Sequence, residues 1–256
     1  MKMFKVVITG SIVGLMISSS VSAADLKTSL GLGVGMAPDY EGSEDYEAVP
    51  LPYARVSWDD SGKYVLLEGE SLRANLLSDN WQLGPMLQYR KGRDDVDNDK
   101  VDKMKDIDDA VEAGMFLAYK TGQWKFGIDA IADISDEHDG YLVTLRGAYT
   151  FDISSELKLT PVVSTTYADD DYMETYFQVD GSNVGSSGLD LYEADSGIKD
   201  VAVSLVADYE INEQWSLLGI AKYTQLLDDA KDSPVVDDEG DDGQMFIGMM
   251  GIYHFN

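Results

Sequence analysis

Apolar and polar residues alternate one by one along much of this chain, in segments of about ten residues. In 141–151 the residues Tyr, Val, Leu, Gly, Tyr and Phe take every second position, and mostly polar or small residues lie between them. The same period runs through 157–167, 201–211, 81–90, 111–120, 124–133, 215–226 and 245–255. A period of two places successive side chains on opposite faces of a strand and fits no helix, so the sequence predicts a series of β-strands.

The turns distinguish a membrane barrel from a soluble β-sandwich, whose strands also alternate. A tilted strand of about ten residues is long enough to cross a bilayer. Trp81, Trp124 and Trp215 each follow a short polar turn, where a membrane barrel places aromatic side chains at the lipid interface. These features favour an all-β fold, a transmembrane antiparallel β-barrel.

Loop lengths alternate along the chain as they do in outer-membrane barrels. The expected long or medium loops, which are acidic, are 39–48, 91–107, 134–139, 168–196 and 227–243. The expected short turns are 59–62, 78–80, 121–122, 152–154 and 212–214. Short periplasmic turns and long outer loops are the outer-membrane pattern, so we expect the short turns in the periplasm and the acidic loops outside the cell.

The turns also predict a strand number. Five short turns, with both chain ends on the same side, give twelve strands if the chain reverses once at Gly69–Glu70. Residues 63–68 and 71–77 are short for spanning strands, so ten strands, with this region folded differently, is the alternative.

The alternation also assigns side chains to the lipid and to the lumen. Val143, Leu145 and Tyr149 are expected to face lipid, and Thr144 to face the lumen. Lumen positions carry both charges: Arg90, Glu112, Asp129, Arg146, Lys158, Asp208 and Lys222. Such a lumen is either a path for solutes or a salt-bridged plug, and twelve strands leave room for only a small pore.

The first residues have the features of a cleaved secretory signal. Lys2 and Lys5 precede an apolar run from Val6 to Ile17, which is too short for a spanning helix, and small residues follow up to Ala23. We expect a signal peptide over 1–23 and one barrel domain over 24–256. Cysteine is absent and the net charge is −28. These values argue against disulfides and against nucleic-acid partners, and favour cationic ligands.

The last strand has a further feature of exported barrels. Met245, Ile247, Met249, Gly251, Tyr253 and Phe255 share one face. This face resembles the C-terminal signal by which the barrel-assembly machinery recognises outer-membrane proteins, although Asn256 follows the final aromatic residue. Tyr253 and Phe255 are therefore the candidate assembly signal, with the assembly machinery and outer-membrane lipid as partners.

Few residues suggest catalysis or cofactor binding. His138, between Asp136, Glu137 and Asp139, could activate water or a serine, but a polar loop tip explains it better. His254 alternates to the lumen side of the last strand and is expected to be a satisfied interior residue. The glycines of 31–35 lie within a strand, with no helix to bind a pyrophosphate, and are expected to allow close packing. We therefore expect no enzyme and no cofactor.

The acidic loop 91–107 contains the best candidate metal ligands. Asp95, Asp97, Asp99 and Asp106 fall at positions 1, 3, 5 and 12 of a calcium loop. Lys100 replaces the glycine that such a loop needs at its turn, and Asp102 stands where an apolar residue is expected. A diffuse attraction of cations by this loop, and by 237–242, fits the sequence better than a specific site.

Several segments together resemble the MltA-interacting protein (MipA/OmpV) family of outer-membrane proteins. They are GVGMAPDYEGSEDY at 33–46 with ProLeuPro at 50–52, GPMLQYRKGRD at 84–94, DIDDAVEAG at 106–114, ADDDYMETYF at 168–177 and DDAKDSPVV at 228–236. They span nearly the whole chain after the signal. The resemblance implies an outer-membrane barrel and, for the founding members, a scaffold that joins a murein hydrolase to a murein synthase.

Two functions remain open from the sequence. In the first, the barrel is a scaffold of the cell envelope, touched by periplasmic murein enzymes at its short turns, with Asp60, Asp79 and Glu213 as candidate contacts. These turns offer about 15 residues, fewer than the roughly 20–30 of a standard interface, so such a contact should be weak or multivalent. In the second, the barrel is a narrow channel for small solutes or cations.

Overall fold

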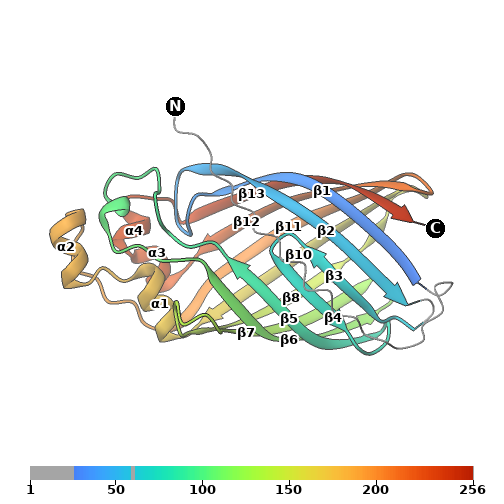
Figure 1. Ribbon diagram of the computed structural model, residues 1–256, viewed down its shortest axis with the longest axis horizontal. Coiled ribbons are helices and arrows are strands. Elements are labelled where there is room, and N and C mark those ends of the chain that lie inside the picture. Colours follow the sequence, from blue (N-terminus) through green and yellow to red (C-terminus); the bar gives the residue numbers. More distant parts are fainter. Residues whose placement is uncertain (1–25, 59–60, 256) are drawn as a thin grey trace.

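The computed structural model describes residues 26–58 and 61–255 (Figure 1). The expected signal peptide and Asp60 lie outside the described residues. Within these ranges no helix is long and apolar enough to cross a bilayer.

The chain folds into a closed antiparallel barrel of twelve strands. The assigned strands are β1 Leu26–Pro38, β2 Tyr46–Trp58, β3 Tyr64–Glu68, β4 Ser71–Asn75, β5 Trp81–Arg90, β6 Ala110–Thr121, β7 Trp124–Asp133, β8 Tyr141–Tyr149, β9 Phe151–Asp152, β10 Leu157–Ala168, β11 Gly197–Asn212, β12 Trp215–Leu226 and β13 Gly243–Phe255. The short β9 continues β8 after Thr150 and pairs with β10 beside it. Pairing of β1 with β13 closes the sheet, so the prediction of twelve strands is confirmed and the alternative of ten is wrong.

The predicted reversal at Gly69–Glu70 is also confirmed. β3 and β4 have five residues each, and Gly69 joins them with φ of +56°, a left-handed conformation that glycine adopts without a steric penalty. The two strands stay short because β3 pairs only with residues 53–57 of β2. The hairpin therefore ends partway along the wall (Figure 1).

Inward and outward side chains alternate as predicted. Leu145 is 51% exposed on the outer face, whereas Thr144 lines an internal cavity and bonds Thr166 across the strand pair at 3.2 Å. Close packing at the glycines of β1 is confirmed, because a Cβ on Gly33 would lie 2.2 Å from the carbonyl oxygen of Met249.

Aromatic side chains form a girdle at each end of the wall. At the short-turn end Trp81, Trp124 and Trp215 are half-exposed on the outer face, and they pack on Tyr119, Tyr149 and Tyr253 respectively. At the other end the exposed tyrosines are Tyr46, Tyr89, Tyr141 and Tyr223. Two aromatic girdles around an apolar band are the surface of a membrane barrel.

The long loops are folded into a compact cap at one end of the barrel (Figure 1). The cap comprises residues 39–45, 91–109, 134–140, 169–196 and 227–242, which lie between the strands. Its helices are η2 Val101–Lys103, α1 Asp170–Phe177, α2 Gly181–Ser187, α3 Asp228–Asp232 and α4 Pro234–Asp237. Tyr172, Phe177, Val179 and Val235 are completely buried there, so these acidic loops have an apolar core of their own.

Candidate functional site beneath the cap

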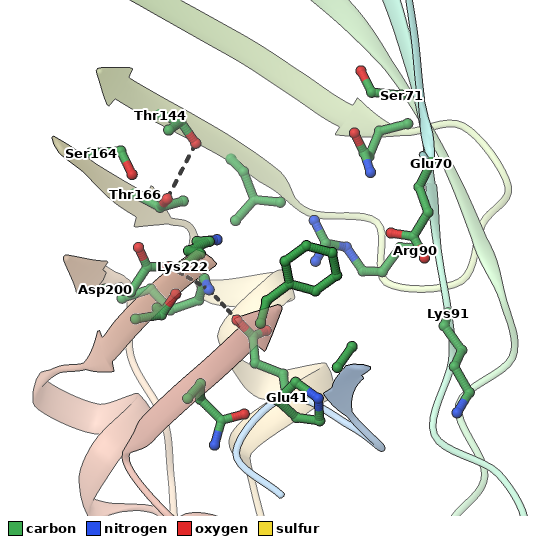
Figure 2. A pocket seen from close by; sticks show the side chains of 18 of the residues that line it. Glu41, Glu70, Ser71, Arg90, Lys91, Thr144, Ser164, Thr166, Asp200 and Lys222 are labelled. Carbon is green, nitrogen blue, oxygen red and sulfur yellow. Dashed lines mark hydrogen bonds and ion pairs between the residues drawn. The ribbon is translucent and has the colours of Figure 1, made fainter. Parts of the chain in front are cut away.

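The main cavity of the described structure lies inside the barrel, directly beneath the cap, and has a volume of about 600 Å³. Inward side chains of the wall form its sides, and residues 39–41 of the cap form part of its roof. Figure 2 shows Glu70, Arg90 and Lys91 on one side of the cavity and Thr144, Ser164, Thr166, Asp200 and Lys222 on the other. The lumen therefore has a mostly polar lining beneath the cap.

Several charged side chains of the lumen are in ion pairs. Arg146 contacts Asp129 at 2.6 Å (Nη2 to Oδ2), and Arg73 lies 3.9 Å from the same oxygen. Nearer the cap, Arg90 donates from Nε and Nη2 to the two oxygens of Glu112, at 2.8 and 3.1 Å. Near the short turns, Lys158 and Asp208 are register partners on β10 and β11. Of the two arrangements considered from the sequence, the salt-bridged lumen fits this geometry.

A charged cluster ties the cap to the barrel wall. The Lys199 ammonium, 5% exposed, lies between Glu41 of the cap and Asp200 of β11, 2.7 Å from Asp200 Oδ2. Tyr172 of α1 donates its O–H to Glu41 Oε2 at 2.6 Å. Burial acts to raise the pKa of Glu41, but the charges of Lys199 and Arg90 outweigh it and lower that pKa to about 2. Glu41 is therefore ionised at any ordinary pH and binds the cap to β11.

The interpretation of His138 as a polar loop tip is wrong. Its side chain is buried, and Nε2 lies 3.1 Å from Glu112 Oε1. The Asp133 carboxylate accepts the backbone N–H groups of 137, 138 and 139, which turns the loop inward. The imidazole then packs against the rings of Tyr172 and Tyr176, at 5.2 and 5.7 Å between centroids. It is a structural residue beneath the cap.

The other histidine lies where the alternation placed it. His254 Nδ1 is 2.8 Å from Ser29 Oγ, and Nε2 is 2.9 Å from Ser216 Oγ. Both ring nitrogens thus have partners on adjacent strands, and the prediction of a satisfied interior residue is confirmed.

The candidate calcium ligands are not gathered around a common point. In the described part of the chain, no three histidine or carboxylate side chains are grouped closely enough to hold a metal ion. The Asp97 N–H donates to Asp39 Oδ2 at 3.0 Å, and Asp95 has a left-handed φ of 51°. Asp95, Asp97, Asp99 and Asp106 therefore show no assembled set of ligands, and the diffuse attraction of cations by this loop stays the prediction.

The remaining predicted residues lie at the short-turn end, opposite the cap. Asp79 and Glu213 are in exposed turns, and Phe255, 47% exposed, lies on the outer face of β13. The Tyr253 ring packs against Trp215 and Phe255, at 5.0 and 4.8 Å between centroids. Their roles in partner contact and in barrel assembly stay predictions.

Sequence reasoning missed the residues that join the cap to the lumen. Glu41, Arg93 and Lys199 were not singled out, because the bonds that join them to distant parts of the chain span 83, 131 and 158 positions. A local signal for α1 does exist: Asp169 precedes Asp170–Phe177, and its carboxylate accepts the Tyr172 N–H, as N-terminal capping residues do.

Comparisons of the sequence with known proteins show the family of this chain. The profile of the family "MltA-interacting protein MipA" matches residues 30–255. The MltA-interacting protein of Escherichia coli strain K12 is 26% identical over 229 residues, which cover 86% of this chain and 88% of that protein. The protein named "Putative outer membrane protein YiaT", from Escherichia coli O157:H7, is 26% identical over 226 residues, covering 86% of this chain and 87% of its own length. Among solved structures, the NanC porin has a TM-score of 0.47 at 12% identity, covering 89% of this chain and all of its own. The chain has the fold of an outer-membrane barrel, and it belongs to the MltA-interacting protein MipA family.

Proposed function

We propose that this protein is a non-enzymatic barrel of the outer membrane that acts as a scaffold for murein enzymes. The name of its Escherichia coli relative, MltA-interacting protein, supports a murein hydrolase as one partner, and a murein synthase is the second partner that we infer. In the orientation that we propose for the membrane, the short turns face the periplasm and the cap faces the outside of the cell. The N-terminal 23 residues would be removed as a signal peptide on export.

The observation that carries this proposal is the packed cap. Phe177, Val179, Val235 and Val236 at the loop end are at most 1% exposed, and ion pairs tie the cap to the wall beneath it. A rigid barrel whose outer mouth is covered has the properties of a membrane anchor rather than of an open pore.

The size of the short-turn surface limits how a partner can bind. The connections at that end, 59–63, 76–80, 122–123, 153–156 and 213–214, are two to five residues long. A standard interface uses roughly 20–30 residues on each side. We therefore propose a weak or multivalent contact through turns that include Asp60, Asp79 and Glu213.

Site-specific photo-crosslinking in living cells tests this proposal. Crosslinkers at Asp79 and Glu213 should capture a murein hydrolase or synthase, and matched crosslinkers at Asp97 and Asp238 in the cap should not. Capture of a murein enzyme at the cap positions alone would contradict the proposed orientation. Nanomolar binding that survives replacement of all the turns by glycine and serine would contradict the proposed contact surface.

A narrow channel is the second candidate function, because the cavity beneath the cap is polar and measures about 600 Å³. Single-channel conductance in planar bilayers separates the two candidates. A scaffold with a closed cap should give no discrete conductance steps. A variant with the loop 169–196 shortened is the control, because removing α1 should open the cavity outward.

A further inference from the structure

The barrel wall has an opening beside the short β3–β4 hairpin. Pairing of β2 with β3 covers only residues 53–57 of β2, and the last bond there runs from the Gly69 N–H to the Pro52 carbonyl at 2.9 Å. Beyond it, residues 47–51 of β2 have no strand partner on this side among the described residues. Across from them, the Tyr89 N–H bonds the Glu70 carbonyl at 2.9 Å. The wall opening is thus bounded by 47–51, the hairpin tip 69–70, and 89–91.

The sequence of β2 is adapted to this unpaired edge. The Pro52 carbonyl points toward β3, so the backbone groups of every second residue before it, including Pro50, point toward the opening. Proline has no N–H, and in a sheet it is confined to edges where no partner strand is present. Pro50 and Pro52 therefore lack the backbone N–H groups that would bond a neighbouring strand if the wall were closed here. The ProLeuPro segment indicates that the opening is a built feature of the barrel.

The cavity lies directly behind this opening. Its lining includes Val49 and Arg90, on the inner face, and Tyr89, a residue of the outer face that is 43% exposed. Lys91 lies across the loop-end side of the opening and donates to the Asp39 side chain at 3.1 Å and to Glu47. Tyr46 and Tyr89, of the loop-end girdle, flank the opening, which therefore faces the lipid of the leaflet nearer the cap.

Behind Lys91 lies a small second cavity, lined by a buried cation that has one unused hydrogen-bond donor. Its volume is about 40 Å³, and it shares Tyr40, Glu41, Arg90 and Lys91 with the main cavity. Arg93 lines it and is 5% exposed; Nη1 bonds the Tyr176 carbonyl at 2.8 Å, but Nε has no partner in the described structure. Tyr176 also lines this cavity, and its buried hydroxyl has no partner in the described structure either.

Unpaired buried donors of this kind need an acceptor from outside the chain. Burial lowers the pKa of Arg93 to about 10, so the guanidinium keeps its charge, and burial raises the pKa of Tyr176, so the phenol keeps its proton. A buried charge without a partner costs free energy. A carboxylate fits two such donors, because its oxygens accept charge-assisted hydrogen bonds from a guanidinium and a hydroxyl. Glu41, beside them, is already bound to Lys199 and Tyr172.

We propose that the barrel binds a long-chain fatty acid through the wall opening, with the carboxylate at Arg93 and Tyr176 and the acyl chain extending past Val49 toward the lipid. Arg90 and Lys91, directly behind the opening, line both cavities. The proposal places the head group in the second cavity and the start of the chain in the main cavity. The outer mouth is covered by the cap, and lateral entry from the membrane needs no movement of the cap.

Binding to the full-length protein in phosphatidylcholine nanodiscs tests the proposal, with anthroyloxy-labelled palmitate as the probe. The wild type should bind the probe saturably, and palmitate should compete better than palmityl alcohol. Arg93→Met should weaken competition by palmitate about tenfold, the loss of one charged hydrogen bond, and leave the alcohol unchanged. Val49→Trp should abolish competition by both. Val206→Trp, on the inner face but away from the cavity, should change neither.

Each outcome decides the proposal. Heat-dependent mobility on gels shows which variants assemble, and Arg93→Gln, which removes the charge but keeps a polar side chain, replaces Arg93→Met if the latter fails to assemble. Binding that is not saturable overturns the proposal. So does an unchanged palmitate affinity in the assembled Arg93 variant, because it places the carboxylate elsewhere. Probe binding that Val49→Trp leaves intact excludes the wall opening as the route.

Discussion

The two ends of this barrel differ in where their large apolar side chains lie, on the outer face at one end and in a buried core at the other. At the short-turn end the connections are two to five residues long, and Trp81, Trp124 and Trp215 stay half-exposed, where lipid is their solvent. At the cap end the connections run up to 28 residues, in 169–196, and Tyr172, Phe177 and Val179 are fully buried. The first end depends on the membrane for its stability, and the second is a small folded unit in water.

The largest expected effect comes from the core of the cap. Phe177→Ala should cost about 3–5 kcal/mol, because a fully buried aromatic ring is lost and leaves a cavity. The loss should be confined to the cap if the two ends are independent. Limited proteolysis of the assembled barrel measures it: cleavage within 169–196 should rise sharply while the strands stay protected. Loss of the whole barrel would show instead that the cap is needed for assembly of the wall.

This difference between the ends also decides what the sequence could reveal. In the wall a single rule, alternation, places every second residue, so Leu145 and Thr144 could be assigned from their positions alone. In the cap the contacts are long-range: Tyr172 bonds Glu41, 131 positions away, and no local pattern contains that pairing. The sequence does contain a sign of α1, because its buried residues follow a helical spacing: Tyr172, Met173, Tyr176 and Phe177. The acidic residues around them led to the prediction of a loop instead.

The next largest effect tests the membrane side of the comparison. Leu145→Arg, at the middle of β8 on the outer face, should cost about 2–4 kcal/mol, the price of a cation near the bilayer midplane. Thr144→Arg is the matched control, because its side chain points into the cavity, where a charge can be hydrated. Unfolding in urea from lipid vesicles measures both variants. Equal losses would mean that the assignment of the two faces is wrong.

Acid should act on the cap before it acts on the wall. The pKa of Glu41 is about 2 in the folded cap against 4.5 for a free glutamate, so its contribution is complete above pH 4.5 and is lost as the pH falls toward 2. Up to about 3 kcal/mol depends on it. Hydrogen exchange of the α1 amides, corrected for the intrinsic effect of pH, should accelerate across this window. Glu41→Gln should remove most of that dependence, and a variant that keeps the full wild-type dependence would exclude Glu41 as its source.

The smallest expected effect comes from the residues that cap the helices of the cap, one buried and one exposed. Ser233 is fully buried; its hydroxyl accepts the Val235 N–H at the start of α4 and donates to the Phe177 carbonyl at 2.5 Å. Ser233→Ala should cost about 1–2 kcal/mol, because the helix start loses its capping group and a buried carbonyl loses its donor.

Asp180 is the matched control: it accepts two N–H groups at the start of α2, but from an exposed position. Water can replace that carboxylate in Asp180→Ala, so this variant should lose less, as measured by hydrogen exchange in the helix that each residue caps, α4 for Ser233 and α2 for Asp180. An equal or larger loss of stability in Asp180→Ala would mean that burial does not set the strength of these capping hydrogen bonds. The cap would then be stabilised by the capping of its helices more than by its apolar core.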